Sequence, residues 1–164
     1  MSPDIALVQL GGHQSHTRIA GYARIDEDAA DEIGQHNWSM DADGYAFRLA
    51  ILPDGRKRVV RMHRQVLGLK HCDGQVTDHI NRDKLDNRRA NLRVGTHALN
   101  CQNMPLRRTS RSGFRGVRRN REGRWQAFAH LRGAFHHLGV FVDPVEAASV
   151  AAEFRRQRMP WATD

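Results

Sequence analysis

Cysteine, lysine and long apolar segments are all scarce in this chain of 164 residues. Its two cysteines, Cys72 and Cys101, are too few for a four-cysteine zinc ribbon and too far apart for a zinc knuckle. They are either ordinary thiols of a reducing compartment or metal ligands helped by His71 or His97. No run of about twenty apolar residues occurs, and the first four residues lack the charged start of a secretory signal. We therefore expect a cytoplasmic protein without a membrane segment.

Several sequence motifs of common catalytic classes are also missing. The chain has no P-loop, no G-x-S-x-G elbow and no H-E-x-x-H helix. Acyl transfer and nucleotide hydrolysis therefore have no candidate residues.

Positive charge is abundant and unevenly placed. Lysine and arginine total 26 against 18 acidic residues, which gives a net charge of +8 and a pI near 10.6. The excess lies mainly beyond residue 55, in the arginine-dense stretches 56–64 and 107–132. Arginine suits phosphate and guanine contacts better than lysine, of which there are only three. A GC-rich genome would explain the preference for arginine but not its clustering, so we expect a nucleic-acid partner.

The most informative residues are Asp78, His79, Asn91 and Asn100. The Asp78 carboxylate and the Asn100 amide oxygen are ligand types that Mg²⁺ takes while it keeps several waters. His79 can accept a proton near neutral pH if a partner holds its other ring nitrogen, and the Asn91 side-chain oxygen would supply that partner. These residues predict phosphodiester hydrolysis around one hydrated cation.

The spacing of these residues predicts a hairpin followed by a helix. The expected elements are a strand over 76–80, a polar turn over 81–87, a strand over 91–94 and a helix capped by Thr96. Asn100 and Asn103 then lie on one helical face. Neighbours in a regular strand point to opposite faces, so we expect the first strand to be distorted at Asp78 and His79.

The wider pattern resembles the HNH endonucleases of phages and mobile introns over roughly residues 20–105. The segments that carry the resemblance are Met62-His63-Arg64, Asp78-His79-Ile80-Asn81, Asp86-Asn87-Arg88-Arg89, Asn91-Leu92-Arg93 and Asn100-Cys101-Gln102-Asn103. The resemblance implies an endonuclease domain over 1–104 with a ββα-metal core at about 74–104. It also implies one Mg²⁺ or Mn²⁺ ion held by Asp78 and Asn100, with His79 as general base and Asn91 as its orienter.

The same resemblance implies a homing endonuclease that cuts double-stranded DNA to 5′-phosphate and 3′-hydroxyl ends. The protein would act in the cytoplasm of a bacterial or phage-infected cell. His63 either contacts phosphate in the site or only packs, and Asn103 is a further candidate for active-site support.

A basic linker over 105–112 separates this part from a different pattern over 113–164. There, GFRGVRR, RWQAFAHL and FHHLGVF read as three short strands, and Asp143-Pro144 starts a helix. This pattern resembles the DNA-binding domain of plant APETALA and ethylene-response factors over about 112–158. The resemblance implies a three-stranded antiparallel sheet, packed on one helix, that enters the major groove of DNA. The DNA-binding candidates are Arg107, Arg108, Arg111, Arg115, Arg118, Arg124, His130, Arg132 and His137.

The predicted fold is α+β, with a strand-rich N-terminal scaffold before the hairpin. Strands are expected within 6–11, 18–26, 45–51 and 56–64, and a short helix within 26–40 that ends near Trp38. The alternative to an endonuclease is a DNA-binding regulator whose first domain is only a scaffold. Intact Asp78, His79, Asn91 and Asn100 argue against that alternative. Either a monomer or a homodimer fits the sequence.

Overall fold

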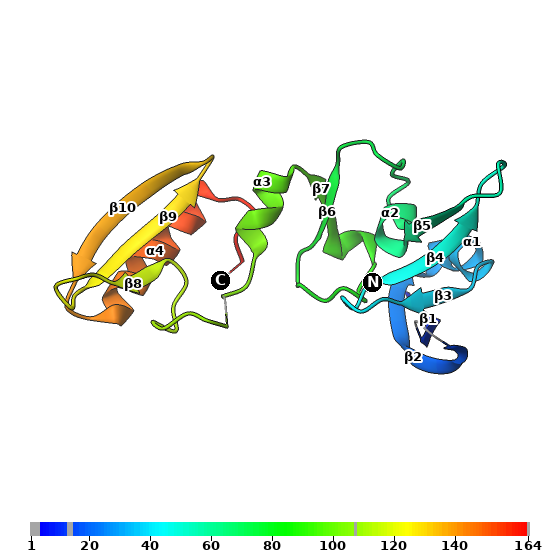
Figure 1. Ribbon diagram of the computed structural model, residues 1–164, viewed down its shortest axis with the longest axis horizontal. Helices are drawn as coiled ribbons and strands as arrows, with labels where there is room; N and C mark the ends of the chain where they lie inside the picture. The colour runs from blue at the N-terminus through cyan, green and yellow to red at the C-terminus, as the bar shows by residue number, and fades with distance from the viewer. Residues whose placement is uncertain (1–3, 13–14, 107, 164) are drawn as a thin grey trace. The chain divides into compact units, whose positions relative to one another are not determined.

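The computed structural model describes residues 4–12, 15–106 and 108–163 and has the predicted α+β composition (Figure 1). Its contacts divide the chain into two compact units, Met1–Thr96 and His97–Asp164. Residues 97–104, which we expected in the first domain, thus group with the second unit. In the described ranges, no helix has the length and apolar character needed to cross a membrane.

A five-stranded sheet in the order β2-β1-β3-β4-β5 forms the scaffold of the first unit. The strands are β1 (Ile5–Gly12), β2 (Ser15–Asp26), β3 (Trp38–Met40), β4 (Ala46–Ile51) and β5 (Lys57–Arg61). Between β2 and β3 the chain forms a 3-10 turn, η1 (Glu27–Ala29), and helix α1 (Ala30–Gly34), and helix α2 (Met62–Val66) follows β5. The core contains Leu10, Ile25, Ile33, Trp38 and Met62, all buried.

The helix predicted within 26–40 does not end near Trp38, because α1 ends at Gly34 and Trp38–Met40 is a strand. Leu10 lies beside Trp38 in a parallel pairing of β1 with β3, and Ser39 pairs with Phe47 of β4. The indole nitrogen of the buried Trp38 donates to the carbonyl of Ile33 at 2.8 Å. These contacts with distant segments override the helical composition of the stretch.

The hairpin predicted around Asp78 is confirmed. Strands β6 (Val76–His79) and β7 (Leu92–Gly95) pair antiparallel, and a 3-10 turn, η2 (Arg89–Asn91), precedes β7. Their register runs from Val76 to His79 without a shift. The expected distortion at Asp78 and His79 is therefore wrong, since His79 ends the strand and a regular strand can present the two side chains to different neighbours.

The loop that joins β6 to β7 is docked on the edge of strand β2 by its main chain. The Arg24 N–H donates to the Leu85 carbonyl at 2.8 Å, and the Asn87 N–H donates to the Arg24 carbonyl at 2.8 Å. Arg24 and Asp86 thus form an isolated parallel bridge, and Leu85 packs against the core of the sheet. This docking fixes the hairpin relative to the scaffold of its own unit.

The second unit begins with helix α3 (His97–Asn100) and a 3-10 turn, η3 (Cys101–Asn103). A three-stranded sheet follows in the order β10-β9-β8, made of β8 (Val117–Arg119), β9 (Trp125–Leu131) and β10 (Ala134–Phe141). Helix α4 (Pro144–Arg158) runs along one face of this sheet (Figure 1). Val117, Ala127, Ala147 and Ala151 form the core between them, with Trp125 packed against it. The predicted sheet on one helix is confirmed.

Two local features explain why this sequence forms the second unit. The side chain of Asp143 accepts from the Val145 N–H at 3.0 Å, so the helix has the predicted N-cap, with Pro144 in its first turn. Gly116 has a φ of +75°, and a Cβ there would lie 2.6 Å from the Phe128 carbonyl oxygen. Only glycine fits this close crossing of the chain over β9.

Candidate active site

Asp78 and His79 lie at the end of β6, and both are buried. Asp78 sits directly across from Arg93 in the hairpin. Its Oδ2 accepts from Arg93 Nε at 2.8 Å and lies 2.7 Å from Arg93 Nη2. The carboxylate is thus held in a fixed position by a guanidinium before any ligand is considered.

His79 belongs to a cluster of three rings. The rings of His63 and His79 meet edge to face with centroids 5.2 Å apart, and the Tyr45 ring lies 5.5 Å from His63 and 5.9 Å from His79. His63 lies in the first turn of α2 and is buried, while Tyr45 directly precedes β4. The sequence left open whether His63 contacts phosphate or only packs. The structure places its ring beside that of His79.

Burial decides the charge state of both histidines. Burial lowers the pKa of His79, although its hydrogen bond to Asn87 and the carboxylate of Asp78 act in the opposite direction. Burial, followed by the neighbouring His79, lowers the pKa of His63 to about 3. Both imidazoles are consequently neutral at neutral pH, and a neutral imidazole is the form that accepts a proton.

Two cations flank Tyr45 beside this cluster. The guanidinium carbon of Arg61 lies 4.7 Å from the centre of the Tyr45 ring, and Lys84 Nζ lies 4.5 Å from it. Lys84 also donates to the Asp43 carbonyl at 2.7 Å, and Arg61 forms an ion pair with Asp41. Burial raises the pKa of Tyr45, so its hydroxyl stays protonated at neutral pH. This side of the cluster suits a phosphate group.

Asn91 lies in η2 and bonds the hairpin loop. Its side-chain oxygen accepts from the Asn81 N–H at 3.0 Å, and its amide nitrogen donates to the Asp86 carbonyl at 2.8 Å. The hydrogen bond that we expected from this oxygen to His79 is therefore replaced by bonds to the backbone. The group 3.3 Å from His79 Nε2 is the side-chain oxygen of Asn87.

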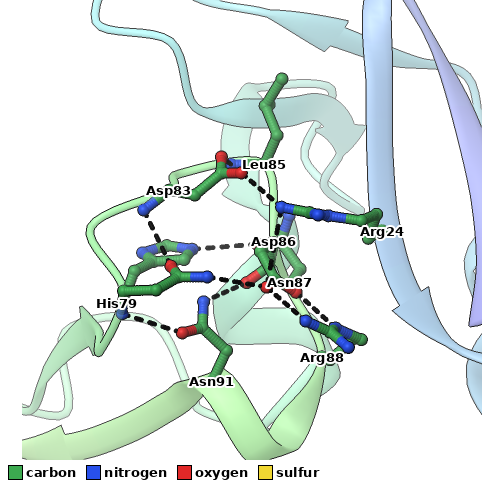
Figure 2. A network of polar contacts seen from close by, with 9 residues as sticks. Arg24, His79, Asp83, Leu85, Asp86, Asn87, Arg88 and Asn91 are labelled. Carbon is green, nitrogen blue, oxygen red and sulfur yellow. Dashed lines mark hydrogen bonds and ion pairs between the residues drawn. The ribbon is translucent and has the colours of Figure 1, made fainter. Parts of the chain in front are cut away.

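Asp86 is the centre of a polar network under the loop, drawn in Figure 2. It is completely buried, and its oxygens accept from Arg88 Nε and Nη2 at 2.7 Å each. Asn81 donates to it at 2.8 Å, and Arg24 Nη2 lies 3.7 Å away. The hydrogen bond from Arg88 is the largest influence that holds the pKa of Asp86 below its ordinary value.

Removal of this carboxylate should destabilise the first unit. Asp86→Ala leaves the donors of Arg88 and Asn81 without their buried acceptor, so we expect a loss of about 1–3 kcal/mol in unfolding free energy at pH 7. Because the folded-state pKa of Asp86 is lowered, its contribution is complete above its ordinary pKa of 3.8 and disappears as pH falls through the folded value. Urea unfolding at pH 7 and at low pH measures both effects.

Asp28→Ala is the matched control for that experiment. Asp28 also pairs with an arginine, Arg89, at 2.6 Å, but its side chain is 73% exposed. Exposed ion pairs contribute little, so this variant should unfold almost like the parent at either pH. Equal stabilities of the two variants at pH 7 would contradict a stabilising role for the Asp86 network.

Asn100 and Asn103 lie in the second unit, at the end of α3 and in η3. Asn103 is buried, and its side-chain oxygen accepts from the hydroxyl of Thr163, a contact within that unit.

For a cation, Asp78 offers the hard carboxylate oxygen that Mg²⁺ prefers. Among the described residues, no group of three or more His, Cys, Asp or Glu side chains is placed so that it could hold a metal ion. This donor set fits an ion that is bound by one or two protein oxygens and retains water.

The cysteines each contact one histidine. Cys72 Sγ lies 2.9 Å from His71 Nδ1, and Cys101 Sγ lies 3.4 Å from His97 Nδ1. Both thiols are exposed and free of disulfide bonds. These are contacts between two side chains, which is fewer than a structural zinc site requires.

Most DNA-binding candidates are exposed, namely Arg108, Arg111, Arg118, Arg124, His130, Arg132 and His137, whereas Arg107 lies outside the described residues. Arg118 has an ordered position: its Nε donates to Gln126 at 2.8 Å, and its guanidinium carbon lies 5.1 Å from the Phe128 ring and 5.5 Å from the Phe135 ring. Arg115 is half-buried, and its guanidinium donates to the Gln102 carbonyl within the same unit.

The sequence did not point to Tyr45, Asn87 or Arg93 as members of the site. Tyr45 reaches His79 only through the fold, and nothing local to it distinguishes it from a core tyrosine. Asn87 was visible within the turn segment Asp86-Asn87-Arg88-Arg89, where asparagine is common for reasons of turn geometry alone. Arg93 could have been found from the register, since a hairpin from 76–80 to 91–94 places it opposite Asp78.

Comparison with known proteins agrees with this geometry. Residues 63–102 match the family model described as HNH endonuclease. The matched segment begins at His63 and includes Asp78, His79, Asn91 and Asn100. No curated protein and no solved structure matches the chain. Residues 63–102 are thus similar to an HNH endonuclease domain, and this similarity supports nuclease activity on DNA.

Proposed function

We propose that this protein is a metal-dependent HNH endonuclease, of the homing type, that hydrolyses phosphodiester bonds in double-stranded DNA. The observation that carries the proposal is the neighbouring pair Asp78 and His79, buried at the end of β6 within the matched segment. A neutral imidazole next to a carboxylate provides a proton acceptor and a cation ligand within one residue of each other.

His79 acts as the general base in the proposed reaction. It takes a proton from the water that attacks the scissile phosphorus, and it is neutral for this purpose because burial lowers its pKa. Asn91 keeps the loop after His79 in place through its two bonds to the backbone. Arg61 and Lys84, which flank Tyr45, attract and position the phosphate beside His79.

Asp78 would hold one Mg²⁺ or Mn²⁺ ion, and Asn100 remains the second ligand that the sequence predicts. When bound, the cation supplies Lewis-acid stabilisation of the charge that develops on the phosphate and on the leaving oxygen. Arg93 keeps the Asp78 carboxylate in position, since its Nε and its Nη2 both contact Oδ2.

The second unit binds DNA through the open face of its sheet. Val117 and Ala127 face helix α4, whereas Arg118, Phe128 and Phe135 lie together on the opposite face. Exposed arginines at the two turns, Arg124 and Arg132, are placed to contact phosphates. This unit would supply affinity and site preference to the nuclease domain.

Arginine substitutions in the turns should weaken DNA binding in a salt-dependent way. For the double variant Arg124→Ala/Arg132→Ala, two lost phosphate contacts should lower the slope of log K against log salt by about 0.9 each. Fluorescence anisotropy with duplex DNA over a salt series measures this slope. Arg156→Ala, on α4 and paired with Glu153, is the matched control and should keep the parent slope. Equal slopes for both variants would remove these turns from the DNA contact.

The chemistry of the DNA ends tests the proposed reaction. DNA cut by the purified protein should carry 5′-phosphate and 3′-hydroxyl groups, so DNA ligase should rejoin it without prior phosphatase or kinase treatment. Ends that ligase rejoins only after such treatment would contradict hydrolysis with a 3′ leaving oxygen.

A further inference from the structure

Asn87 makes the hydrogen bond to His79 that we had expected from Asn91. Its side-chain oxygen lies 3.3 Å from His79 Nε2 (Figure 2). An amide oxygen can only accept a hydrogen bond, so this contact requires a proton on Nε2. A neutral imidazole with its proton on Nε2 carries its lone pair on Nδ1. The contact thus selects which ring nitrogen can accept a proton from water.

The backbone around Asn87 holds its side chain in this place. Its N–H donates to the Arg24 carbonyl of β2 at 2.8 Å, and its neighbour Asp86 is clamped by Arg88. Only 1% of the residue is exposed, so the carboxamide has little room to turn away from His79. The docking of the loop on β2 therefore fixes the imidazole through Asn87.

Folding stability alone does not explain an asparagine at this position. The amide nitrogen Nδ2 of Asn87 is buried and has no hydrogen-bond partner in the described part of the chain. A buried donor without a partner costs about 1–3 kcal/mol, and an apolar side chain of similar size would avoid that cost. The side-chain oxygen of Asn87, by contrast, contacts His79.

We propose that Asn87 is the positioning residue of His79: it holds the imidazole in the Nε2–H tautomer and so makes Nδ1 the atom that receives the proton. This inference rests on the proposed endonuclease function. It assigns the orienting role to Asn87, while Asn91, whose amide bonds only the backbone, shapes the loop.

Nitrogen NMR of the ¹⁵N-labelled full chain tests the tautomer directly. The His79 signals are assigned by comparison with His79→Gln, at a pH where the ring is neutral. We expect the Nε2–H form in the parent and loss of this preference in Asn87→Leu, which removes the acceptor at nearly constant volume. A parent His79 in the Nδ1–H form would overturn the proposal. The spectrum needs no DNA, so failure to cut DNA would refute the proposed function and leave this test standing.

Cleavage and stability of the same variants complete the test. Asn87→Leu should cut DNA about 10–100 times more slowly, as is usual when a partner that orients a histidine is lost, while circular dichroism shows that it is folded. Asn87→Asp keeps an acceptor at the same atom, so it should retain the Nε2–H form and cut at least about ten times faster than Asn87→Leu. Unchanged tautomer and cleavage rate in Asn87→Leu would overturn the proposal. If Asn87→Leu does not fold, the nitrogen spectra of the parent and of Asn87→Asp still test the proposal, because an Nδ1–H form of His79 in either protein would overturn it.

Discussion

His79→Ala should reduce DNA cleavage by roughly 10²–10⁴ while DNA affinity changes little, because a general base usually contributes that factor. No other side chain in the hairpin can replace the imidazole. His63 lies beside it, but burial holds the pKa of His63 at about 3, which makes it a very weak base. Single-turnover cleavage of labelled duplex DNA measures the rate, and anisotropy measures the affinity.

His71→Ala is the matched control for this variant. His71 is exposed in the segment between α2 and β6, and its ring contacts Cys72 Sγ. Its loss should leave the cleavage rate within about twofold of the parent, in the usual range for surface substitutions. A His79→Ala protein that cuts at more than a third of the parent rate would show that His79 is not the base.

Asp78→Ala should abolish cleavage at any practical Mg²⁺ concentration. It removes the anionic ligand of the proposed cation and also leaves Arg93 without its carboxylate. Asn100→Asp instead adds charge while it keeps an oxygen, so that variant should still bind Mn²⁺ and keep part of the activity, because Mn²⁺ accepts carboxylate oxygens readily. Cleavage assays with each cation and calorimetric titration with Mn²⁺ measure the two effects.

Asp73→Ala is the matched control for Asp78→Ala, because it also breaks an ion pair with an arginine but lies outside the proposed cation site. Asp73 pairs with Arg64 at 2.6 Å, and its side chain is 17% exposed, so the variant also leaves an arginine unpaired. It should retain Mn²⁺ binding and cleavage. If Asp78→Ala binds Mn²⁺ as well as Asp73→Ala does, at equal folded fraction by circular dichroism, Asp78 is not a metal ligand.

The elements that could be predicted from the sequence are those with strong local signals. The hairpin around Asp78 follows from two short apolar segments on either side of a polar turn, and the structure has both strands. The second unit follows from turn residues between alternating strands and from the Asp143-Pro144 helix start, both of which the structure contains. Local composition was sufficient because each of these elements is bounded by its own turn or cap.

The parts that could not be predicted depend on contacts between distant segments. Strand β3 forms because Trp38 pairs with Leu10 of β1. Its residues come directly after a stretch whose composition favours a helix, so the sequence predicted a helix there. The sequence predicted Asn91 as the partner of His79, whereas the structure has Asn87 there, because the partner depends on how the loop docks on Arg24 of β2. A spacing in sequence defines which residues are near one another, whereas the docking decides which side-chain atoms meet.

The division of the chain into two units also has a physical origin that composition did not reveal. Arg115 and Trp161 both contact Gln102, and Thr163 contacts Asn103, so the segment after Thr96 gains its partners from the C-terminal residues. We had placed residues 97–104 with the hairpin because Asn100 belongs to the expected metal ligands. The sequence therefore did not indicate the unit in which this segment packs.

The most direct test of endonuclease activity is the conversion of supercoiled plasmid by the purified chain of 164 residues. With Mg²⁺ or Mn²⁺, the parent and His71→Ala should produce nicked or linear plasmid, whereas His79→Ala, and the parent in EDTA, should leave it supercoiled. A parent protein that binds the plasmid without cutting it under any of these cations would contradict the proposal and would favour a DNA-binding regulator. Equal conversion by His79→Ala would contradict it as well.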